Sequence, residues 1–231
     1  MKKIGLLLIA TGKYASLVSQ FISSAKEWLP KKHIWMTFLL TDTDVAGLGI
    51  PREHLPWPLP TLLRYHAFLK HINSLDCMDY LFYLDVDTRF VASVGDEILG
   101  DGLTAVRHSM FWDQPEGWVV GPAGPFEHNE KSQAFTPECK RRIYYDGSLI
   151  GGTREAWLTM ARKIVEWTNA DLSNRIIPRW WDEGYLNRYL AENPPSVTLP
   201  PTYAWRPNLP ENKSAKIVML NKDDNAMRAW E

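Results

Sequence analysis

The first forty residues alternate between two apolar runs and an amphipathic segment, and this order constrains the fold more than any other feature. Residues 4–10 are a short apolar run, and residues 34–40 are a second one rich in aromatic side chains. Between them, residues 14–29 place apolar side chains at helical spacing until Pro30 ends the helix. A strand, a helix and a strand in this order predict parallel strands joined by a crossover, with ligands beyond their carboxyl ends.

Later segments continue the alternation, so we predict one α/β domain. Residues 62–75 have the spacing of a helix with a mainly solvated basic face, and residues 109–140 have the character of a long loop. A second helix is expected after Thr153, its candidate N-cap, with Glu155 in the first turn. Further strands are expected within residues 79–90, 103–106, 142–153, 197–199 and 216–220. No G-x-G-x-x-G motif is present, which argues against a dinucleotide site.

The strand within residues 79–90 ends in two carboxylates, Asp85 and Asp87. In an extended chain alternate side chains share a face, so both would point the same way at the strand's carboxyl end. Two like charges so close repel one another unless a cation lies between them, and hard oxygen ligands suit Mg²⁺ or Mn²⁺ completed by substrate phosphates. The alternative is a strand that runs into a solvated turn, and a D-x-D sequence alone favours that alternative.

Two more segments have patterns that permit a functional or a structural interpretation. In residues 142–153, Gly147 predicts a break in the strand, at a bulge or at a close approach of ligand or backbone, and a Gly-Gly turn would follow. In Trp180-Trp181-Asp182-Glu183, Asp182 can cap a helix with Glu183 in its first turn, where both complement the helix dipole. Spacing alone favours this structural role.

Composition excludes several classes of protein. The 26 basic residues nearly balance the 27 acidic ones, so nothing indicates electrostatic binding to nucleic acid. Cys77 and Cys139 are too few for a disulfide framework, which favours free thiols in a reducing cytoplasm. The N-terminus has two lysines before an apolar run, but that run is short and interrupted by Gly5, so we favour a buried strand over a signal peptide. No other stretch approaches a membrane span, and a soluble cytoplasmic protein is expected.

Several motifs together resemble glycosyltransferase family 6, the family of the histo-blood-group A and B transferases and the α-1,3-galactosyltransferases. The resemblance covers residues 4 to about 228, the catalytic domain without the membrane anchor and stem of animal members. It implies a GT-A type single domain over residues 1–231, with a Rossmann-like, mostly parallel central sheet flanked by helices. Residues 1–100 would form the nucleotide-binding part, and residues 101–231 the acceptor and donor-sugar part with a mobile C-terminal tail. The motifs that agree in order are Tyr80-Leu81 through Asp85-Val86-Asp87 to residues 94–99, then residues 132–137, 144–152 and 180–190.

The resemblance also implies a role for individual residues in a metal-dependent transfer from a UDP-sugar. Asp85 and Asp87 match the motif that binds Mn²⁺, with Mg²⁺ as an alternative, and through it the UDP diphosphate. Glu183 matches the glutamate next to the anomeric carbon, where it would be either a covalent nucleophile or a stabiliser of an oxocarbenium-like transition state. His108, Trp180 and Glu183 would contact a glycan acceptor. The remaining residues expected to bind the nucleotide or the donor sugar are Ile9, Thr11, Tyr14, Arg64, Val86, Asp146, Gly147, Ser148, Asp182, Lys222 and Arg228.

Departures from the animal members affect the expected sugar. The positions of Asp146 and Ser148 help to choose galactose or N-acetylgalactosamine in those members, and the acidic residue is unusual there. Asp146 would either hydrogen-bond a sugar hydroxyl or lie in solvent. We expect a retaining transfer of galactose or N-acetylgalactosamine to a glycan in α-1,3 linkage; the alternatives are a degenerate sugar-binding protein and a UDP-sugar hydrolase on the same fold.

Overall fold

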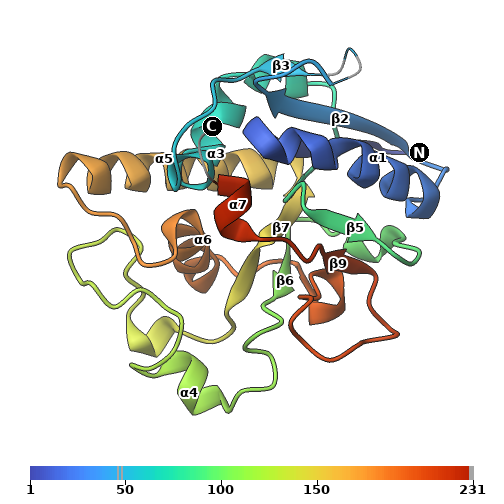
Figure 1. The fold of residues 1–231 in the computed structure, drawn as a ribbon. Coiled ribbons are helices and arrows are strands. Elements are labelled where there is room, and N and C mark those ends of the chain that lie inside the picture. Colours follow the sequence, from blue (N-terminus) through green and yellow to red (C-terminus); the bar gives the residue numbers. More distant parts are fainter. Residues whose placement is uncertain (46, 48, 229–231) are drawn as a thin grey trace.

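The computed structural model describes residues 1–45, 47 and 49–228, in which a seven-stranded sheet has helices on both faces (Figure 1). Its strands are β1 (Lys3–Ile9), β2 (Ile34–Thr41), β3 (Ile50–Pro51), β4 (Tyr80–Leu84), β6 (Leu103–Arg107), β7 (Tyr145–Thr153) and β8 (Val197–Leu199). The α-helices are α1 (Val18–Trp28), α2 (Leu59–Leu62), α3 (Arg64–Leu69), α4 (Glu116–Val120), α5 (Arg154–Ser173), α6 (Trp181–Glu192) and α7 (Asp224–Arg228). Short 3-10 helices are η1 (Gly12–Leu17), η2 (Ile72–Leu75), η3 (Asp96–Ile98), η4 (Glu138–Lys140) and η5 (Pro201–Tyr203).

The sheet is parallel except for β7, in the order β3-β2-β1-β4-β7-β6-β8. Strand β7 runs antiparallel to both neighbours, β4 and β6. Its first residues therefore lie at the carboxyl end of β4, where Leu84 is paired with Leu149 and the Asp85 N–H donates to the Ser148 carbonyl at 2.9 Å. This arrangement confirms the mostly parallel α/β sheet, and it places residues 146–148 on the edge where parallel sheets bind ligands.

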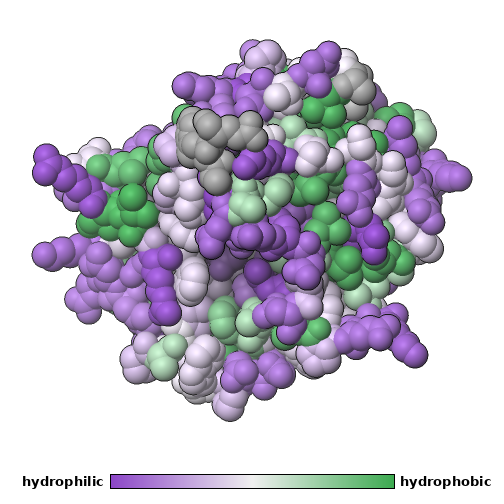
Figure 2. All heavy atoms as spheres, viewed as in Figure 1, coloured by the Kyte–Doolittle hydropathy of each residue, from purple (hydrophilic) through white to green (hydrophobic). Residues whose placement is uncertain are grey.

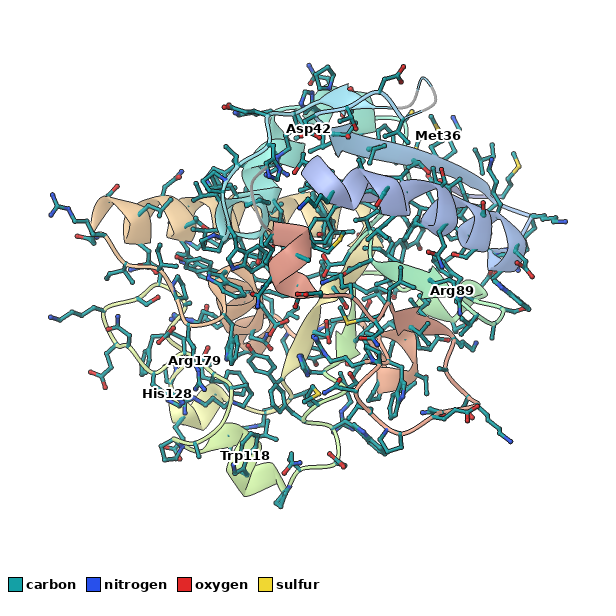
Figure 3. The ribbon with its side chains drawn as sticks, in the orientation of Figure 1. Met36, Asp42, Arg89, Trp118, His128 and Arg179 are labelled. Atoms are coloured by element: carbon teal, nitrogen blue, oxygen red, sulfur yellow. The ribbon has the colours of Figure 1, made fainter. Side chains whose placement is uncertain are left out.

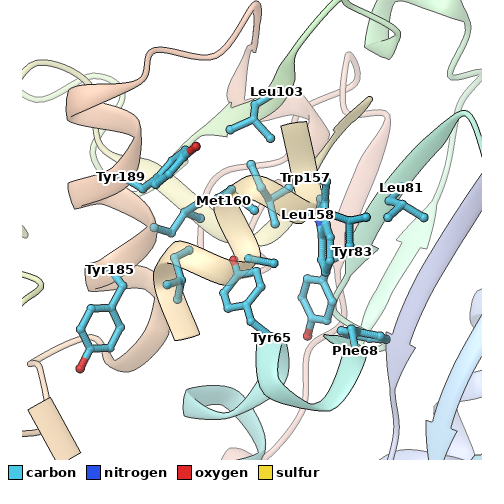
Figure 4. Packing of buried hydrophobic residues seen from close by; sticks show 14 of the residues in the cluster. Tyr65, Phe68, Leu81, Tyr83, Leu103, Trp157, Leu158, Met160, Tyr185 and Tyr189 are labelled. Carbon is cyan, nitrogen blue, oxygen red and sulfur yellow. The ribbon is translucent and has the colours of Figure 1, made fainter. Parts of the chain in front are cut away.

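Alternation along the central strands supplies a core on each face of the sheet. In β4, Phe82 and Leu84 pack with α1, whereas Leu81 and Tyr83 pack with the helices of the opposite face. On that opposite face the rings of Tyr65 and Phe68 pack against Trp157 of α5, and Phe68 also packs against Tyr83 (Figure 4). These aromatic side chains thus hold α3 and α5 against the sheet directly beneath the D-x-D motif.

A second sheet joins the C-terminal segment to the D-x-D turn. Strand β5 (Thr88–Phe90) pairs antiparallel with β9 (Ile217–Met219), and the Leu220 N–H donates to the Asp87 carbonyl at 2.7 Å. Figure 1 shows β9 leading directly into α7, which lies across the middle of this face. The tail expected to cover the site is therefore held at its root by backbone pairing.

The two expected N-terminal helices are more segmented than predicted. The first is divided into η1 and α1, and the one expected over residues 62–75 is divided into α2, α3 and η2. Leu63 departs from helical geometry (φ −104°, ψ 19°), and α3 then begins at Arg64. Arg64 is 4% exposed, so it is an exception to the mainly solvated basic face expected for residues 62–75. Arg64 is buried because it pairs with groups that are themselves buried and distant in the sequence.

Residues 145–153 form one strand, but its register with β6 shifts between the pairs Ala105–Ile150 and Arg107–Tyr145, so an irregularity is present around Gly147 as expected. The predicted Gly-Gly turn was wrong. Gly151 and Gly152 lie within β7, where a Cβ on Gly151 would come within 2.0 Å of the Phe82 ring. Gly152 has φ +144°, and its Cβ would lie 2.2 Å from the Gly102 carbonyl oxygen. The glycines let the backbone of β7 approach its neighbours closely. They therefore serve packing and do not form a turn.

Three other predictions need correction. Asp85 and Asp87 follow β4 in a turn and are not part of the extended strand. Asp182 lies inside the first turn of α6, whose N-cap is Trp180. The expected loop over residues 109–140 contains α4 and η4. By contrast, the Thr153 hydroxyl does accept from the Ala156 N–H at the start of α5, as predicted.

Replacing Gly152 with alanine tests the packing of β7. The positive φ and the clash with the Gly102 carbonyl should lower the free energy of unfolding by about 3 kcal/mol, measured by urea denaturation. Gly117→Ala is the matched control, because a Cβ there meets nothing within 4 Å and α4 tolerates alanine. If both variants kept the parent's stability, the backbone conformation and the close contact assigned to Gly152 would be wrong.

Candidate active site

A cavity of about 600 Å³ opens at the carboxyl ends of β1 and β4. Figure 2 shows a hollow near the middle of this face, with hydrophilic residues gathered around it. The wall contains every residue predicted for the site, from Ile9, Thr11 and Tyr14 at one end to Lys222 and Arg228 in the tail. The structure thus brings the predicted residues together, while their individual roles remain predictions. The Asp42 carboxylate, which follows β2 (Figure 3), accepts a hydrogen bond from the Gly12 N–H at 3.0 Å. This bond fixes the turn that precedes Tyr14.

Asp85 and Asp87 form the acidic floor of the cavity. The Tyr83 hydroxyl donates to Asp85 at 2.5 Å, and the Lys222 ammonium lies 3.0 Å from an Asp87 carboxylate oxygen. Asp87 is 6% exposed, and burial together with the Asp85 charge raises its pKa to about 6 although Lys222 opposes the shift. The two carboxylates, with Lys222 beside Asp87 and Arg64 3.6 Å from Asp85, have the oxygen chemistry that a divalent cation requires.

Arg64 is the central cation of the cavity wall. Its Nε lies 2.7 Å from an Asp182 carboxylate oxygen, its guanidinium donates to the Gly147 carbonyl at 2.9 Å, and one nitrogen lies 3.6 Å from Asp85. The guanidinium also lies over the Tyr83 ring, 4.2 Å from the centroid. Arg64 therefore connects α3, β4, β7 and α6 at the point where the donor sugar is expected. Burial raises the pKa of Asp182 to about 7, although Arg64 favours the charged form.

Glu183 faces the start of β7. Its carboxylate accepts the Gly147 N–H at 2.7 Å, and a side chain at position 147 would meet Glu183 within 3.1–3.4 Å. The expected close approach at Gly147 is therefore made by this catalytic candidate. Burial and the nearby Asp146 raise the pKa of Glu183 to about 8, while the Gly147 N–H, Arg206 and Tyr144 lower it.

The tail contributes a second set of contacts to the cavity, beside Tyr14. Lys222 lies 5.4 Å from the Tyr14 ring centroid, and the Arg228 guanidinium lies 3.7 Å from the centroid of Trp57. Trp57 in turn packs edge-on against Trp181 at 4.7 Å. The predicted basic residues of the tail thus face the cavity beside the residue expected to bind uridine.

Arg206 and Trp57 are the main cavity residues that the sequence did not reveal. Arg206 donates to Asp146 at 3.0 Å and lies 3.1 Å from His108 Nε2. It is an isolated basic residue in a proline-containing loop, and Trp57 precedes Pro58 in a similar segment. Neither lies in a periodic or charged motif, so only the proximity of aromatic and proline residues could have drawn attention to them.

A second set of potential metal ligands exists beside the D-x-D motif. In the described part of the chain, His108, Asp146 and Glu183 bring ligand atoms within 4.8 Å of one another. The guanidinium of Arg206 already contacts two of the three, and a permanent cation there reduces the need for a metal ion. The second set includes the nitrogen ligand His108, whereas Asp85 and Asp87 offer only carboxylate oxygens, so Asp85 and Asp87 are the better candidates for binding Mg²⁺ or Mn²⁺. Among the helices described, none has the length and apolar character required to cross a bilayer.

The raised pKa of Glu183 predicts how stability changes with pH. Its folded value of about 8 lies above the ordinary 4.5, so the folded state retains a proton that the unfolded state has released. Stability should fall as pH rises between these values. Glu183→Gln should remove this loss and gain about 4–5 kcal/mol over the parent at pH 8.5 but little at pH 4.5, in urea unfolding with EDTA. Glu130→Gln, at an exposed carboxylate, is the control; equal pH profiles for parent and Glu183→Gln would refute the assignment.

Comparison with known proteins identifies the family. The model of glycosyltransferase family 6 matches residues 61–229. The human globoside α-1,3-N-acetylgalactosaminyltransferase 1 is 30% identical over 98% of this chain and 68% of its own length. The Escherichia coli O-antigen biosynthesis glycosyltransferase WbnI is 28% identical over 95% of each chain, and the rat histo-blood group ABO system transferase 1 is 26% identical over 97% of this chain and 68% of its own. The chain belongs to glycosyltransferase family 6 and is a hexosyltransferase of the kind that uses UDP-sugar donors.

Proposed function

We propose that this enzyme is a retaining, metal-dependent transferase that moves galactose or N-acetylgalactosamine from a UDP-sugar to a glycan hydroxyl in α-1,3 linkage. The observation that carries the proposal is the position of Asp85 and Asp87 in one cavity with Glu183 and with Lys222 of the tail. The linkage follows the printed name of the human relative. We also propose that the chain acts as one GT-A domain, with residues 1–100 binding nucleotide and residues 101–231 binding donor sugar and acceptor.

In this proposal the nucleotide end handles the charge of the leaving group. Asp85 and Asp87 would hold Mn²⁺, or Mg²⁺ as an alternative, and when bound the ion supplies Lewis-acid stabilisation of the departing diphosphate. Lys222 and Arg228 add positive charge where that negative charge develops, and α7 excludes the water that would hydrolyse the donor. Ile9, Thr11 and Tyr14 bind uridine.

The sugar end aligns the reacting carbon. Arg64 holds Asp182 at 2.7 Å, which orients that carboxylate toward donor-sugar hydroxyls. Glu183, fixed by the Gly147 N–H at 2.7 Å, faces the anomeric carbon and acts as nucleophile or as electrostatic stabiliser. His108 and Trp180 bind the acceptor glycan beside it. Either role requires an ionised Glu183. The Gly147 N–H, Arg206 and the Tyr144 side chain favour that form, whereas burial and Asp146 oppose it and raise the pKa to about 8.

The metal assignment is tested by a screen of UDP-sugars with Mn²⁺ or EDTA, reading UDP release with and without oligosaccharide acceptors. Asp87→Asn should reduce metal-dependent turnover by at least about 1,000-fold, because an amide is a weaker ligand and leaves the diphosphate uncompensated. Asp101→Asn, an exposed position outside the cavity, should leave the rate unchanged. Unaltered turnover in Asp87→Asn or in EDTA would contradict the assignment. UDP release that no acceptor increases would instead favour the hydrolase.

The role of Glu183 is tested by the same assay. Glu183→Gln should lower kcat by about 1,000-fold, since an amide neither attacks nor stabilises the anomeric centre, while the Kd for UDP measured by calorimetry stays within about threefold. Glu130→Gln serves again as the control. Near-normal kcat in Glu183→Gln would remove it from the catalytic machinery.

A further inference from the structure

A second pocket, of about 400 Å³, lies between the end of β6 and the segment that leads into β7. Its wall includes Arg107, Phe111, Trp112, Arg142 and Tyr144, together with a residue of α4, the helix at the bottom of the view in Figure 1. This volume is within the range of about 300–1,000 Å³ that is usual for ligand sites. Phe111 also lines the active-site cavity, where its ring stacks on His108 with centroids 4.5 Å apart. A single aromatic ring therefore stands between the second pocket and His108.

Two arginines reach the second pocket from adjacent strand ends. Arg107 is the last residue of β6 and pairs with Tyr145 at the start of β7, and Arg142 comes three residues before Tyr145. The pairing continues past β6, because the His108 N–H donates to the Tyr144 carbonyl at 3.0 Å. Consecutive side chains of an extended segment point to opposite sides, so His108 lines the active-site cavity while Arg107 lines the second pocket.

The positive charge of Arg107 and Arg142 is not compensated. Both residues are exposed, and within the described part of the chain neither forms an ion pair. Arg142 donates to the Arg141 carbonyl at 2.6 Å, a neutral acceptor that leaves its charge in place. Asp146 on β7 is 0% exposed and is paired with Arg206 at 3.0 Å on the side of the active-site cavity, so it does not lie in solvent, one of the two expectations from sequence. A concave wall that carries charge of one sign attracts an anion.

Aromatic rings supply the rest of the wall. Tyr144 is 3% exposed, and its ring packs edge-on against Phe111 with centroids 5.7 Å apart, so this part of the wall is held in place. Trp112 is 46% exposed, which leaves much of its side chain open to a ligand. A matching ligand thus has an apolar face for the rings and an anionic group for the guanidiniums, which bind carboxylate and phosphate alike. A pyranose presents C–H groups on its face, and it gains the anion when it is phosphorylated or when its primary alcohol is oxidised.

We propose that the second pocket binds a saccharide unit that carries a phosphate or carboxylate group, with Arg107 and Arg142 on the anion and Trp112 on the sugar ring. The unit belongs to the acceptor glycan, at a residue beyond the one that receives the transferred sugar, because only the Phe111 ring separates the pocket from His108. This last assignment rests on the proposed transfer to a glycan, whereas the binding of an anionic saccharide does not.

Calorimetry in the presence of UDP and Mg²⁺ tests the binding, because the nucleotide then occupies its own part of the active-site cavity. Glucose 1-phosphate and methyl β-glucuronide are compared with methyl β-glucoside, which separates phosphate from carboxylate. At least one anionic sugar should bind the parent about tenfold more tightly than the glucoside, and Arg107→Met with Arg142→Met should weaken that binding about tenfold. Arg162→Met, at an exposed position on α5, is the matched control. Equal binding of all three sugars to the parent, or equal binding of the anionic sugar to parent and double variant, would overturn the proposal.

Inorganic phosphate separates a saccharide site from a simple cluster of positive charge. The rings stabilise only a ligand with an apolar face, so Trp112→Ala should weaken binding of the preferred anionic sugar about fivefold and leave the Kd for inorganic phosphate within about twofold of the parent. Ile177→Ala removes an exposed apolar side chain outside both pockets and is the control. If inorganic phosphate bound as tightly as the sugar and Trp112→Ala altered neither, the assignment to a saccharide would be refuted.

Steady-state kinetics test whether the anionic unit belongs to the acceptor. Lactose is compared with lactose 1-phosphate and with β-galactosyl-glucuronic acid, in which the anion lies on the residue beyond galactose. The parent should prefer one anionic acceptor over lactose by about tenfold in kcat/KM, and the double variant Arg107→Met with Arg142→Met should lose that preference. The same preference in parent and double variant would remove the unit from the acceptor.

The two proposals fail in distinguishable ways. If anionic sugars bind through Arg107 and Arg142 but no UDP-sugar is consumed, the transferase function fails and the second pocket remains a site for an anionic saccharide. If metal-dependent transfer is observed and the double variant changes neither sugar binding nor acceptor preference, the assignment of the second pocket fails and the function stands.

Discussion

The buried guanidinium of Arg64 is the interaction on which the rest of the site depends. It is 4% exposed and pairs with Asp182 at 2.7 Å, with the Gly147 carbonyl at 2.9 Å and, more distantly, with Asp85 at 3.6 Å. Removing one member of such a buried network leaves uncompensated charge at a cost of about 3–5 kcal/mol, so its members constrain one another. The network joins the D-x-D turn to the start of α6, and it thereby fixes the position of Glu183 relative to Asp85.

The antiparallel strand β7 makes this network feasible. In an all-parallel sheet the residues beside the carboxyl end of β4 would be the end of a neighbouring strand, leading away into a helix. Because β7 runs the other way, its first residues meet the D-x-D turn, and Gly147 can offer its carbonyl to Arg64 and its N–H to Glu183. Glycine is needed there because a Cβ would press on the Glu183 side chain at 3.1–3.4 Å.

The sequence revealed the parts of this arrangement that depend on local pattern. The parallel opening unit, the buried strand before Asp85 and the cap at Thr153 follow from periodicity and capping chemistry. The burial of Arg64 did not follow from local pattern, because its partners lie on or directly after β4, β7 and α6, far away in the sequence. The role of Gly152 was missed for the same reason: its constraint comes from Gly102, fifty residues earlier in the chain. Family resemblance supplied the candidate residues, but the pairing of Asp146 with Arg206 came only from the structure.

Strand β9 explains how two cations with different proposed roles reach the same cavity. Trp205 pairs with it, donating its N–H to the Ile217 carbonyl at 3.0 Å and accepting from the Met219 N–H at 2.8 Å, so Arg206 is fixed one residue beyond this pairing. At the other end the Leu220 N–H is bound to the Asp87 carbonyl, which sets the position of Lys222. Because one short strand sets the register of both side chains, a shift of β9 would move the cation at each end together. The positions of Arg206 and Lys222 are thus coupled through backbone hydrogen bonds, whereas the carboxylates that these cations face belong to the central sheet and its turns.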